Sequence, residues 1–284
     1  MARSTAARTA PDTVEGSLRF LVPKAEALSV AMPVEGGATP KAGEDRNVDQ
    51  LVPIHNARAA AEAPALDAEG FELTRWDSAM GDFFDDEAVR SVYYPEVVAQ
   101  LKALTGASEV LVFDHTVRVS SEMDRKLRIE RALREPALVL HCDFTVKSGP
   151  QRVRDLFGPE EAEARLAKRV ASFNVWRPIT GPVLNWPLAL GDAQSIATDD
   201  MVPIELVYGE RTGEIYRVTY DPAQRWLYYP AMEADEAVVL KCYDSATDGR
   251  ARFAPHASFD DPTAPPDAPP RQSIELRTLA FLDV

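Results

Sequence analysis

The chain has 284 residues, of which 45% are hydrophobic and 27% are charged, a balance typical of a soluble globular protein. Its 45 acidic and 31 basic side chains give a formal net charge of −14, which argues against nucleic acid or an anionic membrane as the main partner. No run of residues approaches the ~20 apolar positions that a membrane helix needs.

The chain holds two cysteines, Cys142 and Cys242, and both lie in apolar runs typical of strands. Two cysteines are too few for a disulfide framework or a Cys-based zinc cluster. Buried free thiols suit a reducing compartment, and the N-terminus lacks the apolar stretch of a secretory signal. We therefore expect a cytoplasmic protein.

The first third of the chain alternates between weakly patterned segments and short apolar runs. Residues 1–15 predict a disordered tail, and residues 17–23 predict a short strand. Residues 31–50 carry Gly, Pro and charged residues without periodicity, which predicts a loop. Residues 71–76 predict a second strand.

Residues 85–107 predict a helix, because their apolar side chains recur at helical spacing. Acidic residues stand at the start of this segment, and Gly106 is placed to end it. Pro95 should kink the helix or divide it into two, because proline donates no backbone hydrogen bond. A second helix is predicted from about Pro159 to Ala171.

Most of the remaining chain predicts short strands separated by turns that contain Pro and Gly. The expected strands are 109–119, 137–146, 173–179, 203–209, 215–221, 225–230, 237–244 and 273–284. The pair on either side of Asp221 and Pro222 predicts a hairpin. This pattern indicates a mainly β protein with flanking helices, built on a barrel or sandwich. We expect one domain over 16–284, with an N-terminal, partly helical elaboration over about 16–107 and the β core over about 108–284.

The segment "HCDFT" (141–145) ends an apolar strand, on which alternation directs His141 and Asp143 to the same side. One further histidine, His256, follows far downstream in "RFAPHASFDDP". Two histidines and one carboxylate in this order are typical of the facial triad that binds Fe(II) and leaves positions open for other ligands. By itself the short motif is equally consistent with a histidine that is satisfied by a carboxylate on its own strand.

The segment "RQSIELR" follows 15 residues after His256 and carries Arg271 and Ser273 on one face of a strand. A guanidinium binds a carboxylate through two hydrogen bonds, and a neighbouring hydroxyl can add a third. Such a pair suits the distal carboxylate of 2-oxoglutarate. Arg277 lies on the same face of a regular strand and is the second candidate for this anchor.

Several long blocks of the sequence share a resemblance with one family. They are "YYPEV", "TGASEVLVFDHTVR", "HCDFT", "FNVWRPI", "LYYPAMEADEAVVLKCYDS", "PHASFDDP" and "PPRQSIELR". The chain resembles the iron and 2-oxoglutarate oxygenase-like family that contains the small subunit of cephalosporin 7α-methoxylase and the fungal gibberellin desaturase-like hydroxylases. The resemblance implies a double-stranded β-helix (a jelly-roll, cupin-like core) that uses Fe(II), 2-oxoglutarate and O2. It also implies that His141, Asp143 and His256 are the metal ligands.

Six further side chains are candidates for the wall of a substrate pocket: Arg177, Asn174, His115, Arg118, Trp176 and Tyr228. Arg177 suits either the binding of a ligand carboxylate or a structural ion pair. Asn174 points to the opposite side of the strand from Arg177, so the two side chains line one pocket only if the strand bends. Trp176 and Tyr228 suit either the hydrophobic core or a substrate platform. His115 suits a structural role or a place in the pocket wall.

The function expected from the residues and the resemblance together is the oxidation of an unactivated C–H bond in a small specialised metabolite or amino-acid-like substrate. Hydroxylation, desaturation and oxidative cyclisation all fit this expectation. Two alternatives stay open from the sequence: a cupin-like metal enzyme that does not use 2-oxoglutarate, and a non-catalytic partner subunit of a biosynthetic enzyme. The expected partner is a small molecule rather than nucleic acid or a membrane, and formation of a homo-oligomer stays open.

Overall fold

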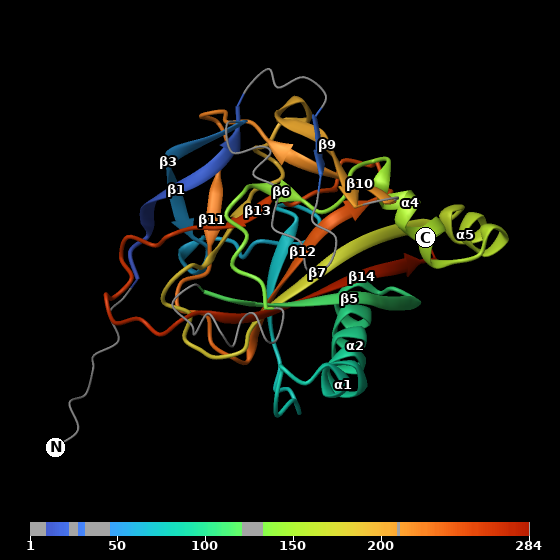
Figure 1. The fold of residues 1–284 in the computed structure, drawn as a ribbon, viewed down its shortest axis with the longest axis horizontal. Coiled ribbons are helices and arrows are strands. Elements are labelled where there is room, and N and C mark those ends of the chain that lie inside the picture. Colours follow the sequence, from blue (N-terminus) through green and yellow to red (C-terminus); the bar gives the residue numbers. More distant parts are fainter. Residues whose placement is uncertain (1–9, 23–27, 32–45, 121–132, 209–210, 284) are drawn as a thin grey trace.

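The structure is a computed structural model that describes residues 10–22, 28–31, 46–120, 133–208 and 211–283 (Figure 1). Its strands are β1 (Thr13–Leu21), β2 (Leu28–Ala31), β3 (Asn47–Asn56), β4 (Phe71–Arg75), β5 (Glu109–Val119), β6 (His141–Cys142), β7 (Arg169–Pro178), β8 (Leu188–Gly191), β9 (Met201–Tyr208), β10 (Arg211–Val218), β11 (Trp226–Tyr228), β12 (Glu236–Asp244), β13 (His256–Ser258) and β14 (Gln272–Leu282). Its helical segments are η2 (Ala57–Ala59), α1 (Asp86–Ala88), η3 (Val89–Tyr93), α2 (Tyr94–Thr105), α4 (Ser148–Leu156), α5 (Pro159–Leu166) and η4 (Thr198–Asp200).

The strands form two sheets. The five-stranded sheet has the order β4-β12-β7-β14-β5, and the nine-stranded sheet has the order β1-β3-β11-β8-β13-β6-β10-β9-β2. From β5 to β8 the chain passes from one sheet to the other at each strand, and from β11 to β14 it does so again. The neighbouring strands of this central set are antiparallel. This is the double-sheet topology of a jelly roll, so the predicted fold class is confirmed.

The two faces of the five-stranded sheet bury different side chains. On β7, Phe173 and Val175 belong to a core that also includes Val97 and Leu101 of α2. Trp176, the next residue along the strand, belongs to a separate core between the two sheets. Burying side chains of this size stabilises the fold by about 1.5–3 kcal/mol each. Because side chains alternate along β7, one face of the sheet packs against α2 and the other face lines the interior between the two sheets.

The predicted helix over 85–107 is one continuous helical segment with a change of winding. Asp85 caps it through bonds to the backbone N–H groups of Glu87 and Ala88, and α1 passes into η3, which is a π-helical turn. Pro95 stands directly after this π-helical turn, at the start of α2, and donates no backbone hydrogen bond to the preceding turn. Gly106 ends α2 in the left-handed region at φ 70°.

Several predicted boundaries change in the structure. β1 begins at Thr13, inside the segment predicted as a disordered tail, and residues 47–50 of the predicted loop belong to β3. The rest of that tail and of that loop lies largely outside the described residues. The N-terminal third supplies strands to both sheets.

The predicted hairpin around Asp221 is wrong. β10 pairs with β9 over eight residues and also with β6, whereas β11 pairs with β3 and β8. Of the predicted strand 137–146, only His141 and Cys142 form ladder pairs, as β6. β9 and β10 are neighbours in the chain, but the pairings of β10 with β6 and of β11 with β3 and β8 join distant segments, and local turn chemistry carries no information about those.

A cluster of buried charges connects β7 to β12. Asp244 is fully buried; its Oδ2 lies 2.6 Å from an Arg169 nitrogen and 3.1 Å from the Lys241 ammonium. We expect Asp244→Ala to lower the free energy of unfolding by about 3–5 kcal/mol, because the buried Lys241 loses one of its acidic partners. Urea denaturation measures this change. Asp248→Ala, which removes an exposed ion pair with Arg250, is the control and should change stability little.

Candidate metal centre

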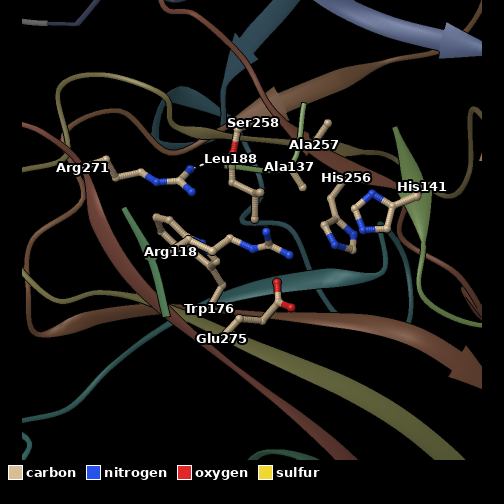
Figure 2. A pocket seen from close by; sticks show the side chains of 10 residues that line it. All are labelled: Arg118, Ala137, His141, Trp176, Leu188, His256, Ala257, Ser258, Arg271 and Glu275. Carbon is tan, nitrogen blue, oxygen red and sulfur yellow. Dashed lines mark hydrogen bonds between the residues drawn. The ribbon is translucent and has the colours of Figure 1, made fainter. Parts of the chain in front are cut away.

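The two predicted histidines face each other across a pair of strands. β6 and β13 are antiparallel neighbours, and His141 is the cross-strand partner of His256. The ring centroids lie 4.6 Å apart, and Figure 2 shows both imidazoles entering the same pocket. Asp143 follows two residues after His141, and its Oδ1 lies 4.0 Å from His141 Nε2. One donor atom from each of the three residues lies within 4.8 Å of the other two.

Backbone carbonyls orient both imidazoles. Nδ1 of His141 lies 2.8 Å from the carbonyl oxygen of Val139, and Nδ1 of His256 lies 3.1 Å from that of Ala254. A carbonyl only accepts, so each Nδ1 carries the proton, and each Nε2 keeps a lone pair for a metal. Burial, together with the charge of His256, lowers the pKa of His141 to about 4. The imidazole of His141 is therefore neutral at physiological pH, as a metal ligand must be.

The carboxylate of Asp143 is also held from several sides. The Asn174 amide donates a hydrogen bond to Oδ2, and the Cys242 thiol donates a longer one of 3.7 Å to the same oxygen. Oδ1 lies 3.7 Å from Nε of Arg277. Burial alone would raise the pKa of Asp143, but the charge of Arg277, followed by smaller contributions from the histidines and Asn174, lowers it. Asp143 is therefore ionised, with Oδ1 as the oxygen left for a metal.

One face of the five-stranded sheet carries a row of polar side chains toward this centre. Arg271, Ser273, Glu275 and Arg277 occupy alternate positions along β14 and the residue before it, so they share a face. Arg277 lies at the Asp143 end of the row, where it donates hydrogen bonds of 2.6 Å to Glu275 and 3.1 Å to Thr116. Its guanidinium is thus already engaged by the protein.

Arg271 lies at the other end of the row and keeps unused donor capacity. Its Nη1 donates to the carbonyl oxygen of Trp186 at 2.5 Å and to Oγ of Ser258 at 2.7 Å. Among the described residues, Nε of Arg271 and Oγ of Ser273 are buried without a hydrogen-bond partner. Burial and the charge of Arg118 lower the pKa of Arg271 to about 9. Buried, unpaired donors of this kind fit the carboxylate of a bound ligand.

Both sheets contribute to the wall of the pocket that joins these groups. The nine-stranded sheet supplies the two histidines and Leu188, while the five-stranded sheet supplies Arg118, Trp176 and Glu275 (Figure 2). The Trp176 ring lies under the Arg271 guanidinium at 5.5 Å. Trp176 and Arg118 therefore belong to the pocket, and Asn174 supports it through Asp143.

Three predicted pocket residues lie elsewhere. Arg177 is buried on the helix side of β7, where its guanidinium stacks over the Trp76 ring at 4.8 Å. His115 also faces the helices: its Nδ1 lies 2.8 Å from the Tyr94 hydroxyl. Tyr228 is buried in another core, edge-on to Phe259. Strand parity explains the first two, because the neighbours Trp176 and Thr116 take the interior face.

Two residues with a role at the centre were missed by the sequence reasoning. Glu275 lies between the two ends of the polar row, and Cys242 contacts Asp143 from β12. Glu275 could have been found from strand alternation, because it stands two residues after Ser273. Nothing in the sequence places Cys242 beside Asp143, since the two residues are 99 positions apart.

Comparisons with known proteins agree with this geometry. A family model described as "Oxidoreductase/YMDC permease-like domain" matches residues 18–281. The "Fe(II)/2-oxoglutarate-dependent dioxygenase nvfI" of Aspergillus novofumigatus is 33% identical over 256 residues, which cover 86% of this chain and 88% of that protein. The chain belongs to the Fe(II)/2-oxoglutarate-dependent dioxygenases. A "Hydroxylase/desaturase efuI" of Hormonema carpetanum is 30% identical over 82% of this chain and 83% of that protein.

A solved structure supports the same membership. The "iron and alpha-ketoglutarate-dependent endoperoxidase NvfI" superposes with a TM-score of 0.82 at 30% identity, covering 95% of this chain and 98% of that one. The chain is thus a non-haem oxygenase whose cofactors are Fe(II) and 2-oxoglutarate, as expected, and the cupin-like alternative that does not use 2-oxoglutarate loses its support. In the described part of the chain, no helix is long and apolar enough to cross a membrane.

We expect Asn174→Ala to weaken metal binding about 10- to 100-fold, the usual effect of removing a partner that orients a metal ligand. The fully buried Asn174 amide holds Oδ2 of Asp143 and thereby directs Oδ1 toward the two imidazoles. Anaerobic titration of the purified protein with Co(II) measures the affinity. An unchanged affinity would mean that Asn174 does not orient Asp143.

Proposed function

We propose that this oxygenase oxidises a C–H bond of a small specialised metabolite, with His141, Asp143 and His256 as the ligands of Fe(II). The observation that carries the proposal is the convergence of three metal-binding atoms within 4.8 Å, two of them on imidazoles whose Nδ1 atoms are occupied by backbone carbonyls. Two nitrogens and one carboxylate oxygen are the ligand set that non-haem Fe(II) oxygenases use. The intact set also counts against a non-catalytic partner subunit.

We assign the distal carboxylate of 2-oxoglutarate to Arg271 and Ser273. The buried Nε of Arg271 and Oγ of Ser273 point to this assignment, because each is a donor without a partner among the described residues. Arg277 has no such capacity: it is bonded to Glu275 and lies 3.7 Å from Asp143, so it orients the carboxylate ligand instead. Bound iron, with 2-oxoglutarate and O2, supplies the oxidising chemistry.

The side chains of this protein bind, orient and enclose the reactants. Arg271 and Ser273 fix one end of the co-substrate, and Trp176 closes the pocket beneath Arg271. Asn174 and Arg277 keep Asp143 ionised and aligned, and the two backbone carbonyls keep the imidazoles from rotating. The reacting carbon is chosen by its placement beside the metal, so hydroxylation, desaturation and oxidative cyclisation all fit this site.

The names of the relatives support the substrate class. They include hydroxylase/desaturases, an endoperoxidase and a protein of aspirochlorine biosynthesis.

We also propose that residues 16–284 form a single oxygenase domain, because β1 and β3 share a sheet with β13, and β4 shares one with β14.

The experiment is a coupled assay of the iron-loaded protein with 2-oxoglutarate and O2 against a panel of small metabolites. We expect a matching substrate to raise the release of succinate well above the uncoupled rate and to yield a product changed at one carbon. Succinate release by Arg271→Met that equals the release by the wild-type protein would contradict the proposal. The panel also includes amino-acid-like compounds, so the same assay distinguishes them from other small metabolites as substrates.

A further inference from the structure

A second arginine enters the pocket and has no assigned role. Arg118 lies near the end of β5, and its cross-strand partner is Ser273. Strand pairing therefore places it on the same face as the proposed 2-oxoglutarate anchor. Figure 2 shows its guanidinium between Arg271 and the imidazole of His256, with the Glu275 carboxylate beneath.

Within the described part of the chain, no carboxylate lies within ion-pair distance of Arg118. Its Nη1 donates a hydrogen bond of 2.9 Å to the backbone carbonyl of Glu135. The nearest pocket acid, Glu275, accepts its 2.6 Å bond from Arg277 instead. Arg118 is only partly buried, and a partly buried guanidinium without an acidic partner at the wall of a pocket is typical of a site that receives an anion.

The charge of Arg118 acts at both ends of the pocket. Burial lowers the pKa of Arg118, and the charges that act on it include Glu275 and Asp143. Arg118 in turn helps to lower the pKa of Arg271. Two like charges thus face one pocket, and they repel each other until a negative group lies between them.

We propose that Arg118 binds the second carboxylate of the 2-oxo acid, the one next to the keto group, while Arg271 and Ser273 hold the distal carboxylate. This inference rests on the proposed function. A 2-oxo acid that chelates a metal at the triad keeps its keto-acid end near His256, which is the end that Arg118 reaches. Arg118 is then a binding residue for the co-substrate and not part of the substrate pocket.

The charge balance favours the co-substrate over an anionic substrate as the partner of Arg118. With one divalent iron counted, the metal ligand Asp143 and the charged residues that line the pocket leave two positive charges; those lining residues are Arg118, Arg271 and Glu275. A 2-oxo dicarboxylate neutralises both of them. The part of the substrate that meets the metal is therefore expected to be uncharged.

The test compares two ligands that differ only at the distal end. 2-Oxoglutarate carries both carboxylates, whereas 2-oxobutyrate has the keto-acid end and no distal carboxylate. Anaerobic titration of the Fe(II) protein, followed by visible absorption of the iron chelate, gives both affinities. We expect Arg118→Met to weaken both ligands by about 10- to 100-fold, as for a lost hydrogen bond to a charged group.

Arg271→Met is the matched variant. It should weaken 2-oxoglutarate but leave 2-oxobutyrate within about 2-fold of wild type, since that ligand makes no bond to a distal anchor. Arg118→Lys should recover part of the affinity for both ligands, because it retains the positive charge. Arg154→Met, at an exposed ion pair with Glu163, controls for the removal of an arginine anywhere in the chain.

Three outcomes would overturn the inference. Affinities of Arg118→Met that equal those of wild type would remove Arg118 from the co-substrate site. Weakened Fe(II) binding with unchanged 2-oxo acid binding would make Arg118 a counter-charge for Glu275. Thermal unfolding shows whether Arg118→Met folds. If it does not, the test uses Arg118→Lys, whose ammonium has a different donor geometry. Wild-type affinity of that variant for 2-oxobutyrate would contradict the inference. A wild-type protein that binds neither ligand would instead refute the proposed function.

Discussion

His256→Ala is expected to abolish 2-oxoglutarate turnover and to weaken metal binding by more than about 100-fold, the upper end of the loss seen for outer-shell partners of metal ligands. The imidazole is 2% exposed, it lies opposite His141, and its Nδ1 is already bonded to the Ala254 carbonyl. Its removal leaves two ligands, and no third donor among the described His, Cys, Asp and Glu residues replaces it. Anaerobic Co(II) titration and succinate release measure the two effects.

His55→Ala is the matched control for this loss. His55 lies in β3, where its Nδ1 pairs with the Thr13 hydroxyl at 3.0 Å, and it takes no part in the triad. We expect this variant to keep both metal affinity and turnover. Metal binding in His256→Ala as tight as in wild type would reject the proposed ligand set, whatever happened to activity.

Arg271→Met is expected to raise the KM for 2-oxoglutarate by about 10- to 100-fold, with a much smaller change in kcat at saturating co-substrate. The guanidinium is buried, and it is positioned by the Trp186 carbonyl and the Ser258 hydroxyl while its Nε stays unpaired. Ser273→Ala should give a smaller increase of about 2- to 10-fold, because a single neutral hydroxyl is lost. Steady-state kinetics with 2-oxoglutarate as the varied reactant separates the two parameters.

Arg277→Met discriminates between the two candidate anchors. Because Arg277 lies beside Asp143 and is bonded to Glu275, we expect this variant to lose metal affinity rather than affinity for 2-oxoglutarate. The opposite pattern, with a raised KM in Arg277→Met and an unchanged KM in Arg271→Met, would exchange the roles of the two arginines.

Much of the candidate site could be predicted from local patterns. Alternation along a strand is independent of the rest of the fold, so it correctly separated Asn174 from Arg177 and grouped Arg271 with Ser273 and Arg277. The order of His141, Asp143 and His256 predicted a triad, and the structure brings the three side chains together. The helix that ends at Gly106 was likewise visible, because apolar spacing and a left-handed cap are local properties.

Pairings between distant segments could not be predicted in the same way. The turn residues near Asp221 predicted a hairpin, yet β10 and β11 pair with other strands of the nine-stranded sheet. Register between strands depends on which apolar faces are buried together, and this depends on the whole sheet. The same limit applies to His115: the sequence left a structural role and a place in the pocket wall open, and only the fold turns this side chain toward the helices.

By itself the sequence determined the residue types of the centre, their order along the chain and the face of the strand on which each stands, because these follow from composition and from the two-residue period of a strand. Only the tertiary structure decided which of two arginines on one face is engaged by Asp143 and Glu275 and which keeps buried, unpaired donors. It also decided that Arg118 lies between Arg271 and His256 (Figure 2). The physical reason is that the pKa and the free hydrogen-bonding capacity of a charged group depend on its neighbours and its burial. Both are set by strands that meet only in the folded chain.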